Sequence, residues 1–181
     1  MIRTALIVLL ITTTQADAES ITGKVILLDG DTVRFSRADA PDQTVRLFGI
    51  DTPERAQQCL SGSGEQYACG SEATKFLAGL IGAQFGSRSL SKRDITCHFV
   101  PGQTSYGRKI GVCYLDTINL NLELVRAGWA VAYRRYLDLV QELKPLFLNA
   151  EDRARRGERG IWQGQFIYPW RWRKGQRLKG Q

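Results

Sequence analysis

The sequence is poor in histidine, and it has no long hydrophobic run beyond its N-terminal segment. His98 is the only histidine among 181 residues. A mechanism that needs two histidines, or a zinc hydrolase built from several, is therefore excluded. The chain also has no Gly-x-Ser-x-Gly and no Gly-x-x-x-x-Gly-Lys-[Ser/Thr] segment. Their absence excludes an α/β-hydrolase nucleophile elbow and a P-loop.

The composition is that of one folded domain. Of all residues, 43% are apolar and 24% are charged, which excludes a disordered chain and a collagen-like repeat. The formal net charge of +7 points to an anionic partner. The charge is uneven, because residues 151–181 hold nine basic and three acidic residues. Segment 170–174 alternates tryptophan with arginine, and is either a contact for a nucleic-acid backbone or a solvated tail.

Residues 1–18 have the pattern of an export signal. Arg3 supplies a positive charge, Ala5 to Ile11 is a short apolar run, and Ala16-Asp17-Ala18 fits a small-x-small cleavage site. The apolar run is too short to span a bilayer. We therefore expect a mature protein that starts at Glu19, has no stable membrane association, and is periplasmic or secreted. An uncleaved anchor or a buried first strand is the alternative.

Four cysteines are present, and an oxidising compartment favours two disulfides over four free thiols. A zinc site would more naturally contain a Cys-x-x-Cys pair, whereas the nearest two cysteines here are ten residues apart. Three pairings are possible. We favour Cys59–Cys69, which would close a loop rich in glycine and serine, and Cys97–Cys113, which would join two strand-like segments.

The order of predicted elements indicates a mainly β domain with helices, of the α+β class. Short β-rich segments are separated by turn-prone residues, and apolar residues recur at helical spacing in later segments. Ser71 and Asn121 are expected to cap the first two helices. Five short strands, with a helix between the third and fourth, favour a five-stranded Greek-key barrel of the OB type with three helices. The predicted strands are residues 21–28, 32–36, 44–50, 94–100 and 109–115, and the predicted helices lie near 71–81, 121–128 and 145–156.

Two charged residues lie where the pattern favours apolar ones. Asp31 alternates with Val33 and Phe35, so its carboxylate shares the apolar face of that strand. Such a carboxylate is costly unless it is paired, hydrogen-bonded or bound to a metal. Arg46 interrupts an otherwise apolar strand, and a buried guanidinium needs an anion from the protein or from a ligand. The alternative for Asp31 is a plain turn at Asp29-Gly30-Asp31.

The segment Asp51-Thr52-Pro53-Glu54 follows the Arg46 strand directly. One interpretation is a helix start, because an acid or threonine before proline, with Glu at the third position, is a capping pattern. The sharper interpretation groups Asp31, Asp51 and Glu54 with backbone carbonyls and waters as an all-oxygen metal site. Hard oxygen ligands suit Ca²⁺ or Mg²⁺ rather than zinc, and the larger, more flexible Ca²⁺ shell fits irregular loop ligands better.

Three spaced motifs give the sequence a resemblance to a known family. They are Asp29-Gly30-Asp31-Thr32, Arg46-Leu47-x-Gly49-Ile50-Asp51-Thr52-Pro53-Glu54, and Tyr106-Gly107-Arg108. Together with the segment 121–130, they resemble the thermonuclease family, which has the staphylococcal-nuclease-like fold. The resemblance covers residues 20–162. It implies an OB-barrel, Ca²⁺-dependent nuclease that acts on DNA and RNA and leaves 3′-phosphates.

The resemblance also implies a role for each matching residue. Asp31 and Asp51 match the calcium carboxylates, and Thr52 matches the residue whose backbone carbonyl binds the metal. Glu54 matches the general base on the attacking water, and Asp29 matches an acid in the outer calcium shell. The arginines on the scissile phosphate are matched by Arg46 and Arg108, and the tyrosines lining the nucleotide site by Tyr106 and Tyr133.

The leading hypothesis is an exported, Ca²⁺-dependent endonuclease that hydrolyses DNA and RNA with little sequence specificity and is monomeric. Its catalytic domain would span residues 19–164, after a signal peptide at 1–18 and before a basic, aromatic tail at 165–181. A noncatalytic nucleic-acid-binding OB module is the alternative from another class, and a secreted structural domain is a third. The full set of ionisable residues at the family positions favours the enzyme.

Overall fold

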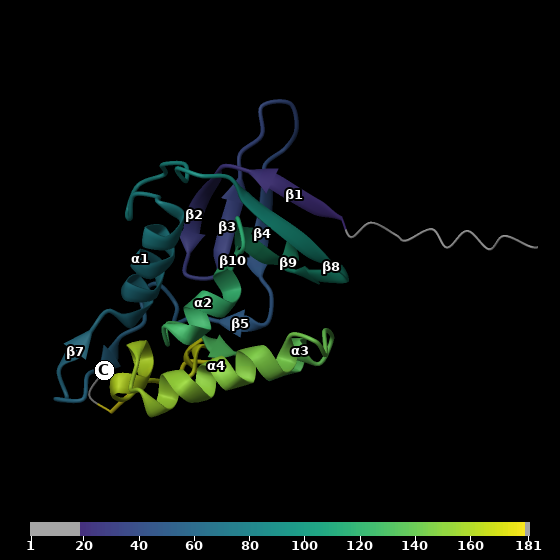
Figure 1. Cartoon of the computed structure of the whole chain (residues 1–181). Coiled ribbons are helices and arrows are strands. Elements are labelled where there is room, and N and C mark those ends of the chain that lie inside the picture. The colour runs from purple at the N-terminus through teal and green to yellow at the C-terminus, as the bar shows by residue number, and fades with distance from the viewer. Residues whose placement is uncertain (1–18, 180–181) are drawn as a thin grey trace, which may run out of the picture.

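The computed structural model describes residues 19–179, so the predicted signal peptide at residues 1–18 lies outside the described residues. A twisted β-sheet fills the upper part of the view in Figure 1, with α1 (Cys69–Ile81) beside it. Below the sheet lie α2 (Leu120–Arg126) and the longer α4 (Lys144–Arg156). Within the described residues, no helix has both the length and the apolar character needed to cross a membrane.

The main sheet in residues 19–179 has six strands in one path and a short strand at the side. The path is β1-β8-β9-β4-β3-β2, and β10 pairs with β9. The strands are β1 (Ser20–Gly23), β2 (Val25–Asp29), β3 (Thr32–Phe35), β4 (Gln43–Leu47), β8 (Ile95–Ser105), β9 (Arg108–Leu115) and β10 (Ile118–Asn119).

The sheet closes on itself because its two end strands are one run of chain. Only Lys24 separates β1 from β2, and these two halves pair with β8 and β3, at opposite ends of the path. Neighbours along this path pair antiparallel, apart from β4 and β9, which run parallel. Counting β1 and β2 as one bent strand gives a five-stranded closed barrel. The predicted α+β class and OB-type barrel are confirmed.

The three predicted helices correspond to α1, α2 and α4, and single helical turns occur in addition. These turns are α3 (Arg134–Leu137), α5 (Pro169–Trp172) and the 3₁₀ helix η1 (Gly160–Gln163). Two short strand pairs complete the described elements: β5 (Ile50–Asp51) with β11 (Val131–Ala132), and β6 (Cys59–Leu60) with β7 (Gln66–Tyr67).

Both predicted helix caps are wrong, the first by three residues and the second by two. The first helix, α1, begins at Cys69, before the predicted cap Ser71. The second, α2, is capped by Asn119, whose side-chain oxygen accepts a backbone N–H. Asn121 is fully buried inside that turn, where its amide accepts the Cys113 N–H and donates to two barrel carbonyls. Asn121 therefore ties α2 to the barrel, a tertiary role that resembles a cap in sequence.

Two buried clusters hold the molecule together. The larger fills the barrel and continues between the barrel and the helices α1, α2 and α4. The smaller consists of Cys59, Cys69, Val131 and Ile161, and it is covered by aromatic residues from the end of the chain. These aromatic residues are Trp162, Phe166, Tyr168 and Trp170. The aromatic residues between 162 and 170 are therefore packed against the rest of the protein rather than extended into solvent.

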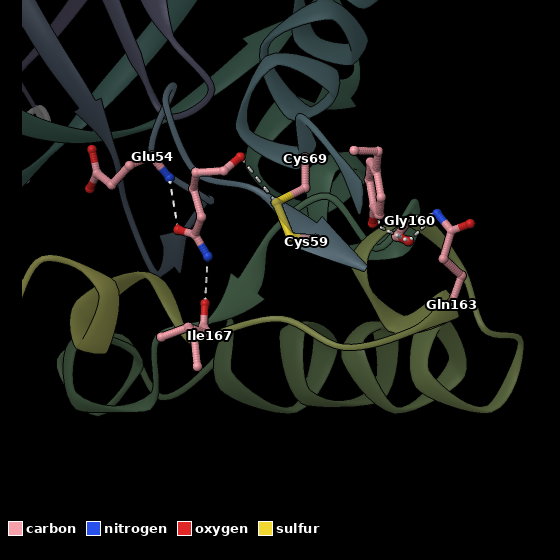
Figure 2. The surroundings of a disulfide bond; sticks show 8 residues. Glu54, Cys59, Cys69, Gly160, Gln163 and Ile167 are labelled. Atoms are coloured by element: carbon pink, nitrogen blue, oxygen red, sulfur yellow. Dashed lines mark hydrogen bonds between the residues drawn. A yellow bond between two sulfur atoms is a disulfide. The ribbon is translucent and has the colours of Figure 1, made fainter. Parts of the chain in front are cut away.

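Both disulfides favoured by the sequence are present. Cys59–Cys69 joins β6 to the first residue of α1, and Cys97–Cys113 joins opposed residues of β8 and β9. The first bridge lies beside the chain segment that carries Glu54 (Figure 2). It therefore connects the start of α1 with the neighbourhood of a predicted site residue.

Candidate active site

Three charged side chains meet where β3, β4 and β5 come together. The sheet register places Thr32 opposite Arg46, which brings the preceding Asp31 alongside the arginine. One guanidinium nitrogen of Arg46, Nη2, lies 2.6 Å from Asp31 Oδ2 and 2.8 Å from Asp51 Oδ1. Both carboxylates are buried. The anion that a buried Arg46 requires is thus supplied by the protein itself.

The arrangement of Asp31 and Asp51 fits a single cation. Because both carboxylates reach the same nitrogen of Arg46, a positive ion can contact both at once. Burial raises the pKa of Asp31 well above its ordinary value; Arg46 opposes this shift, and Asp29 adds to it. Both carboxyl groups are thus poorly solvated, and hard oxygen donors of this kind favour Ca²⁺ or Mg²⁺.

A metal held here would need more than side chains. Among the described residues, no three His, Cys, Asp or Glu side chains group closely enough to form a metal site. The Asp31 and Asp51 carboxylates would have to be joined by backbone carbonyls and water, as the sequence interpretation expects for Thr52. Thr52 is buried and lines the same cavity as Asp31. The donor set is therefore compatible with the flexible, all-oxygen shell of Ca²⁺.

The backbone of Glu54 is held by Gln57, a fully buried side chain. The Glu54 N–H donates to Gln57 Oε1 at 3.2 Å, and the Gln57 N–H donates to the Glu54 carbonyl at 2.7 Å. No helix begins at this segment in the described structure, so the helix-start interpretation of residues 51–54 is wrong. A turn closed by Gln57 is found instead of a helix. The side-chain oxygen of Gln57 accepts the Glu54 N–H, which a capping side chain would otherwise bind.

A close backbone approach also constrains Glu54. A Cβ atom at Gly70, in the first turn of α1, would collide with the Glu54 carbonyl oxygen. Only glycine therefore lets the helix lie against this segment. In Figure 2, Glu54 lies to one side of the Cys59–Cys69 bridge, and Ile167 lies below, on the C-terminal segment of the chain.

The turn between β8 and β9 directs Arg108 into the site. Tyr106 and Gly107 have φ angles of 50° and 76°, both in the left-handed region that glycine adopts easily. Arg108 Nη1 then lies 3.3 Å from the Thr32 hydroxyl, and its Nε donates to the Ser105 carbonyl at 3.1 Å. Among the described residues its hydrogen-bond partners are uncharged, so this arginine is available to an anionic ligand, unlike Arg46.

These elements surround one cavity of about 330 Å³. It brings together every predicted site residue except Asp51, which is buried behind Arg46. Four residues in its wall had no predicted role in the site: Pro53, Ser105, Tyr136 and Arg173. Tyr106 is almost fully exposed at the rim, while Tyr133 packs against Tyr136 with ring centroids 4.9 Å apart. The predicted residues in the wall are Asp29, Asp31, Arg46, Thr52, Glu54, Tyr106, Arg108 and Tyr133.

Arg173 is the site residue that sequence reasoning missed. Its Nη1 donates to Glu54 Oε1 at 2.6 Å, and its Nη2 donates to Asp51 Oδ2 at 2.8 Å. Partial burial alone would lower the pKa of Arg173, but hydrogen bonds to Asp51 and then Glu54 outweigh it and raise that pKa. A usable signal was the row of aromatic residues before it, which indicates a packed segment rather than a solvated tail.

Comparison with known proteins agrees with this geometry. Residues 44–164 match the model of the family described as "Staphylococcal nuclease homologue". The chain is 32% identical to the succinoglycan biosynthesis protein ExoI of Rhizobium meliloti, over 87% of this chain and 72% of that protein. It is 28% identical to an "Uncharacterized endonuclease" of Haemophilus influenzae, over 97% of this chain and 85% of that one.

A plant relative carries the family name itself. The "Probable staphylococcal-like nuclease CAN1" of Oryza sativa is 27% identical, over 74% of this chain and 33% of that protein. Members of this family generally need a metal ion, which agrees with the paired carboxylates at Asp31 and Asp51. The matched region, the OB-type barrel and the cavity lead to one conclusion: the chain belongs to the staphylococcal nuclease homologue family.

Proposed function

We propose that this protein is an exported, Ca²⁺-dependent endonuclease that hydrolyses the phosphodiester bonds of DNA and RNA with little sequence specificity. One observation carries the proposal: Asp31 from a buried carboxylate pair, Glu54 on a fixed turn, and Arg108 with uncharged partners line one cavity. Family membership and the endonuclease names of relatives support the same reaction class. The pattern of residues 1–18 supports export to the periplasm or beyond.

Asp31, Asp51 and the Thr52 carbonyl would hold the metal ion. When bound, Ca²⁺ supplies a Lewis acid and a template at the phosphate, which otherwise repels an anionic nucleophile. The residues themselves contribute buried oxygen donors, since both carboxyl groups are shielded from solvent. Asp29 lies beside them and accepts the Asp31 N–H at 3.1 Å, which orients the loop that carries the first ligand.

Glu54 would act as the general base. Its side chain is about one-third exposed, so water can reach the carboxylate while the backbone stays fixed by Gln57. Glu54 takes a proton from water, the water oxygen bonds to phosphorus, and the bond from phosphorus to the 5′ oxygen breaks. Protonation of that leaving oxygen completes the hydrolysis and leaves a 3′-phosphate.

Arg108 and Arg46 would stabilise the charge that grows on the phosphoryl oxygens. A guanidinium can form two parallel hydrogen bonds to a phosphate, which a lysine ammonium cannot. Arg108 has the freer geometry, because Arg46 is already bound to two carboxylates. The tyrosines at the cavity, Tyr106 and Tyr133, offer flat faces on which bases can stack without reading their sequence. This arrangement suits a substrate range that includes both nucleic acids.

The deciding experiment incubates the mature protein with plasmid DNA, single-stranded DNA or RNA, with Ca²⁺ or with a calcium chelator. We expect cleavage only with Ca²⁺, and 3′-phosphate ends that a phosphatase removes. Glu54→Gln should abolish turnover while nucleic-acid binding persists. Cleavage that is insensitive to chelator would refute calcium dependence. Binding without cleavage under every divalent ion would instead favour the noncatalytic OB module.

The matched control for that experiment is Glu65→Gln. Glu65 lies in the exposed loop between β6 and β7, and its side chain takes no part in the cavity. This control removes the same charge and introduces the same amide as Glu54→Gln. Equal loss of turnover in both variants would contradict the assignment of Glu54 as the base. The N-terminal residue of protein recovered from periplasm and medium, found by mass spectrometry, tests export and cleavage before Glu19.

A further inference from the structure

The chain returns to the active site after the family-matched region has ended. That region stops at Gly164, and the segment 165–179, here called the C-terminal strap, follows it. Aromatic rings mark its path along the body of the protein. Phe166 packs edge-on against Trp162 with centroids 5.0 Å apart, and Tyr168 stacks on Trp170 at 4.6 Å. Trp170 then reaches Tyr133, a cavity residue, at 5.6 Å.

Hydrogen bonds fix the strap at two points before Arg173. Gln165 and Leu60 exchange backbone hydrogen bonds of 2.8 and 3.0 Å. The Ile167 carbonyl accepts a 2.6 Å hydrogen bond from Gln57 Nε2, the same side chain that holds the Glu54 backbone (Figure 2). The strap is therefore anchored next to the catalytic turn, and Arg173 extends from that anchor.

Arg173 occupies the oxygens that a metal ion would need. Its guanidinium contacts both Asp51 oxygens, at 3.0 and 2.8 Å, and Glu54 Oε1 at 2.6 Å. Arg46 Nη2 also donates to Asp51 Oδ1, at 2.8 Å. A carboxylate has about four lone-pair positions, so three of those on Asp51 are already used. A cation that takes Asp51 as a ligand must compete with Arg173.

Of the two arginines on Asp51, Arg173 can leave more easily. Its side chain is 39% exposed and comes from the end of a one-turn helix, whereas Arg46 is 17% exposed within a barrel strand. Rotation about the bonds of its three-methylene stem would free Asp51 while Trp170 and Ile167 keep the strap in place. Solvent already reaches Arg173, so its release exposes little new surface.

We propose that Arg173 competes with the divalent cation for Asp51, so that the C-terminal strap sets the metal affinity of the site. The proposal rests on the proposed function, because it takes Asp51 as a metal ligand. Metal binding then requires the Arg173 guanidinium to release Asp51. The strap raises the Ca²⁺ concentration at which the enzyme becomes active.

The test measures Ca²⁺ binding without nucleic acid, by calorimetric titration of wild type, Arg173→Gln and Arg177→Gln. Arg177 is the matched control, since it is a strap arginine that stacks on Trp172 at 4.1 Å and donates only to backbone carbonyls. We expect Arg173→Gln to bind Ca²⁺ about tenfold more tightly, because hydrogen bonds between charged groups no longer oppose it. Arg177→Gln should match wild type.

A second readout follows the side chain itself. In nitrogen NMR spectra of the full chain, the Arg173 Nε–H signal, assigned by its absence in Arg173→Gln, should move on Ca²⁺ addition, and the Arg177 signal should not. Equal Ca²⁺ affinity in all three proteins, with a stationary Arg173 signal, would overturn the competition alone. Absence of Ca²⁺ binding in all three would overturn the competition and also the calcium dependence of the proposed function.

Discussion

Two arginines from different regions of the molecule bind the same carboxylate. Arg46 belongs to β4, at the centre of the barrel, and pairs with Asp31 and Asp51. Arg173 belongs to the C-terminal strap, 122 residues from Asp51, and pairs with Asp51 and Glu54. The sheet register holds the first, while aromatic packing delivers the second. The same chemical group is therefore structural in one region and exchangeable in the other.

The largest expected effect is the loss of stability on replacing Arg46, the arginine within the barrel. Arg46→Leu leaves two buried carboxylates without their common partner, which should destabilise the fold by about 3–5 kcal/mol. Arg173→Gln removes a more exposed pair and should cost at most about 1 kcal/mol. Urea denaturation in chelator-containing buffer measures both. Comparable losses in the two variants would contradict the distinction between a fixed and an exchangeable arginine.

The turn that carries Glu54 lies between the two regions, so shifting it tests both. Gly70→Ala puts a methyl group against the Glu54 carbonyl and should displace the base by a fraction of an ångström or more. Misplacement on the scale of 1 Å can cost about 100-fold in turnover. Steady-state cleavage of a short oligonucleotide checks this, with Gly79→Ala in the same helix as control, because its Cβ would enter open space. Equal rates in both variants would count against the close approach.

The pH dependence of stability tests whether Arg46 fully compensates Asp31. Burial raises the pKa of Asp31 in the folded protein, so the folded state holds this proton more tightly than the unfolded state does. Its contribution to stability is therefore complete below the ordinary aspartate pKa of about 4 and is lost as pH rises through the folded value. Relative to Asp31→Asn, wild type should lose unfolding free energy over that range.

Urea denaturation of both proteins at several pH values, in chelator, measures that difference. Asp152→Asn is the control, because Asp152 is an exposed acid on α4, paired with Arg156. A difference that stays constant with pH would mean that the arginine cancels the effect of burial.

The smallest expected effect concerns the exposed part of the strap. Lys174 is exposed and sits next to Arg173, so it can contact a nucleic-acid backbone without taking part in the cavity. Lys174→Gln should lower the slope of log affinity against log salt concentration by about one unit, or less on a single strand. Fluorescence anisotropy with a labelled oligonucleotide in chelator measures it. An unchanged slope would mean that Lys174 makes no contact with the nucleic-acid backbone.

The local part of the site could be predicted from the sequence because its residues lie in short motifs. Asp31 and Arg46 stood out as charges on apolar strands, and the register then explains their pairing. Both disulfide pairs were favoured for a similar reason, since each closes a short connection. The cap prediction for α2 failed because Asn121 makes long-range hydrogen bonds that imitate a local signal.

The alternation of tryptophan and arginine after residue 169 left two interpretations open, a backbone contact and a solvated tail. The structure excludes a solvated tail for Trp170 and Arg173, which contact Tyr133 and the Asp51–Glu54 pair. The structure adds a third role, the pairing of Arg173 with carboxylates of the site. A guanidinium can bind a nucleic-acid phosphate, and it can also bind a buried carboxylate. Composition gives the sign of the charge, but it does not tell whether the anion that binds Arg173 is a nucleic-acid phosphate or a carboxylate of the protein.

The sequence by itself determined the barrel and marked Asp31, Asp51, Glu54 and Arg108 as candidate site residues, because alternation and short motifs are local properties. Only the tertiary structure decided that Arg173 closes the site. Its contact depends on Gln57 and the aromatic rings guiding a distant segment back to the cavity. Contacts over such a separation follow from the summed packing of many residues, which no single motif encodes.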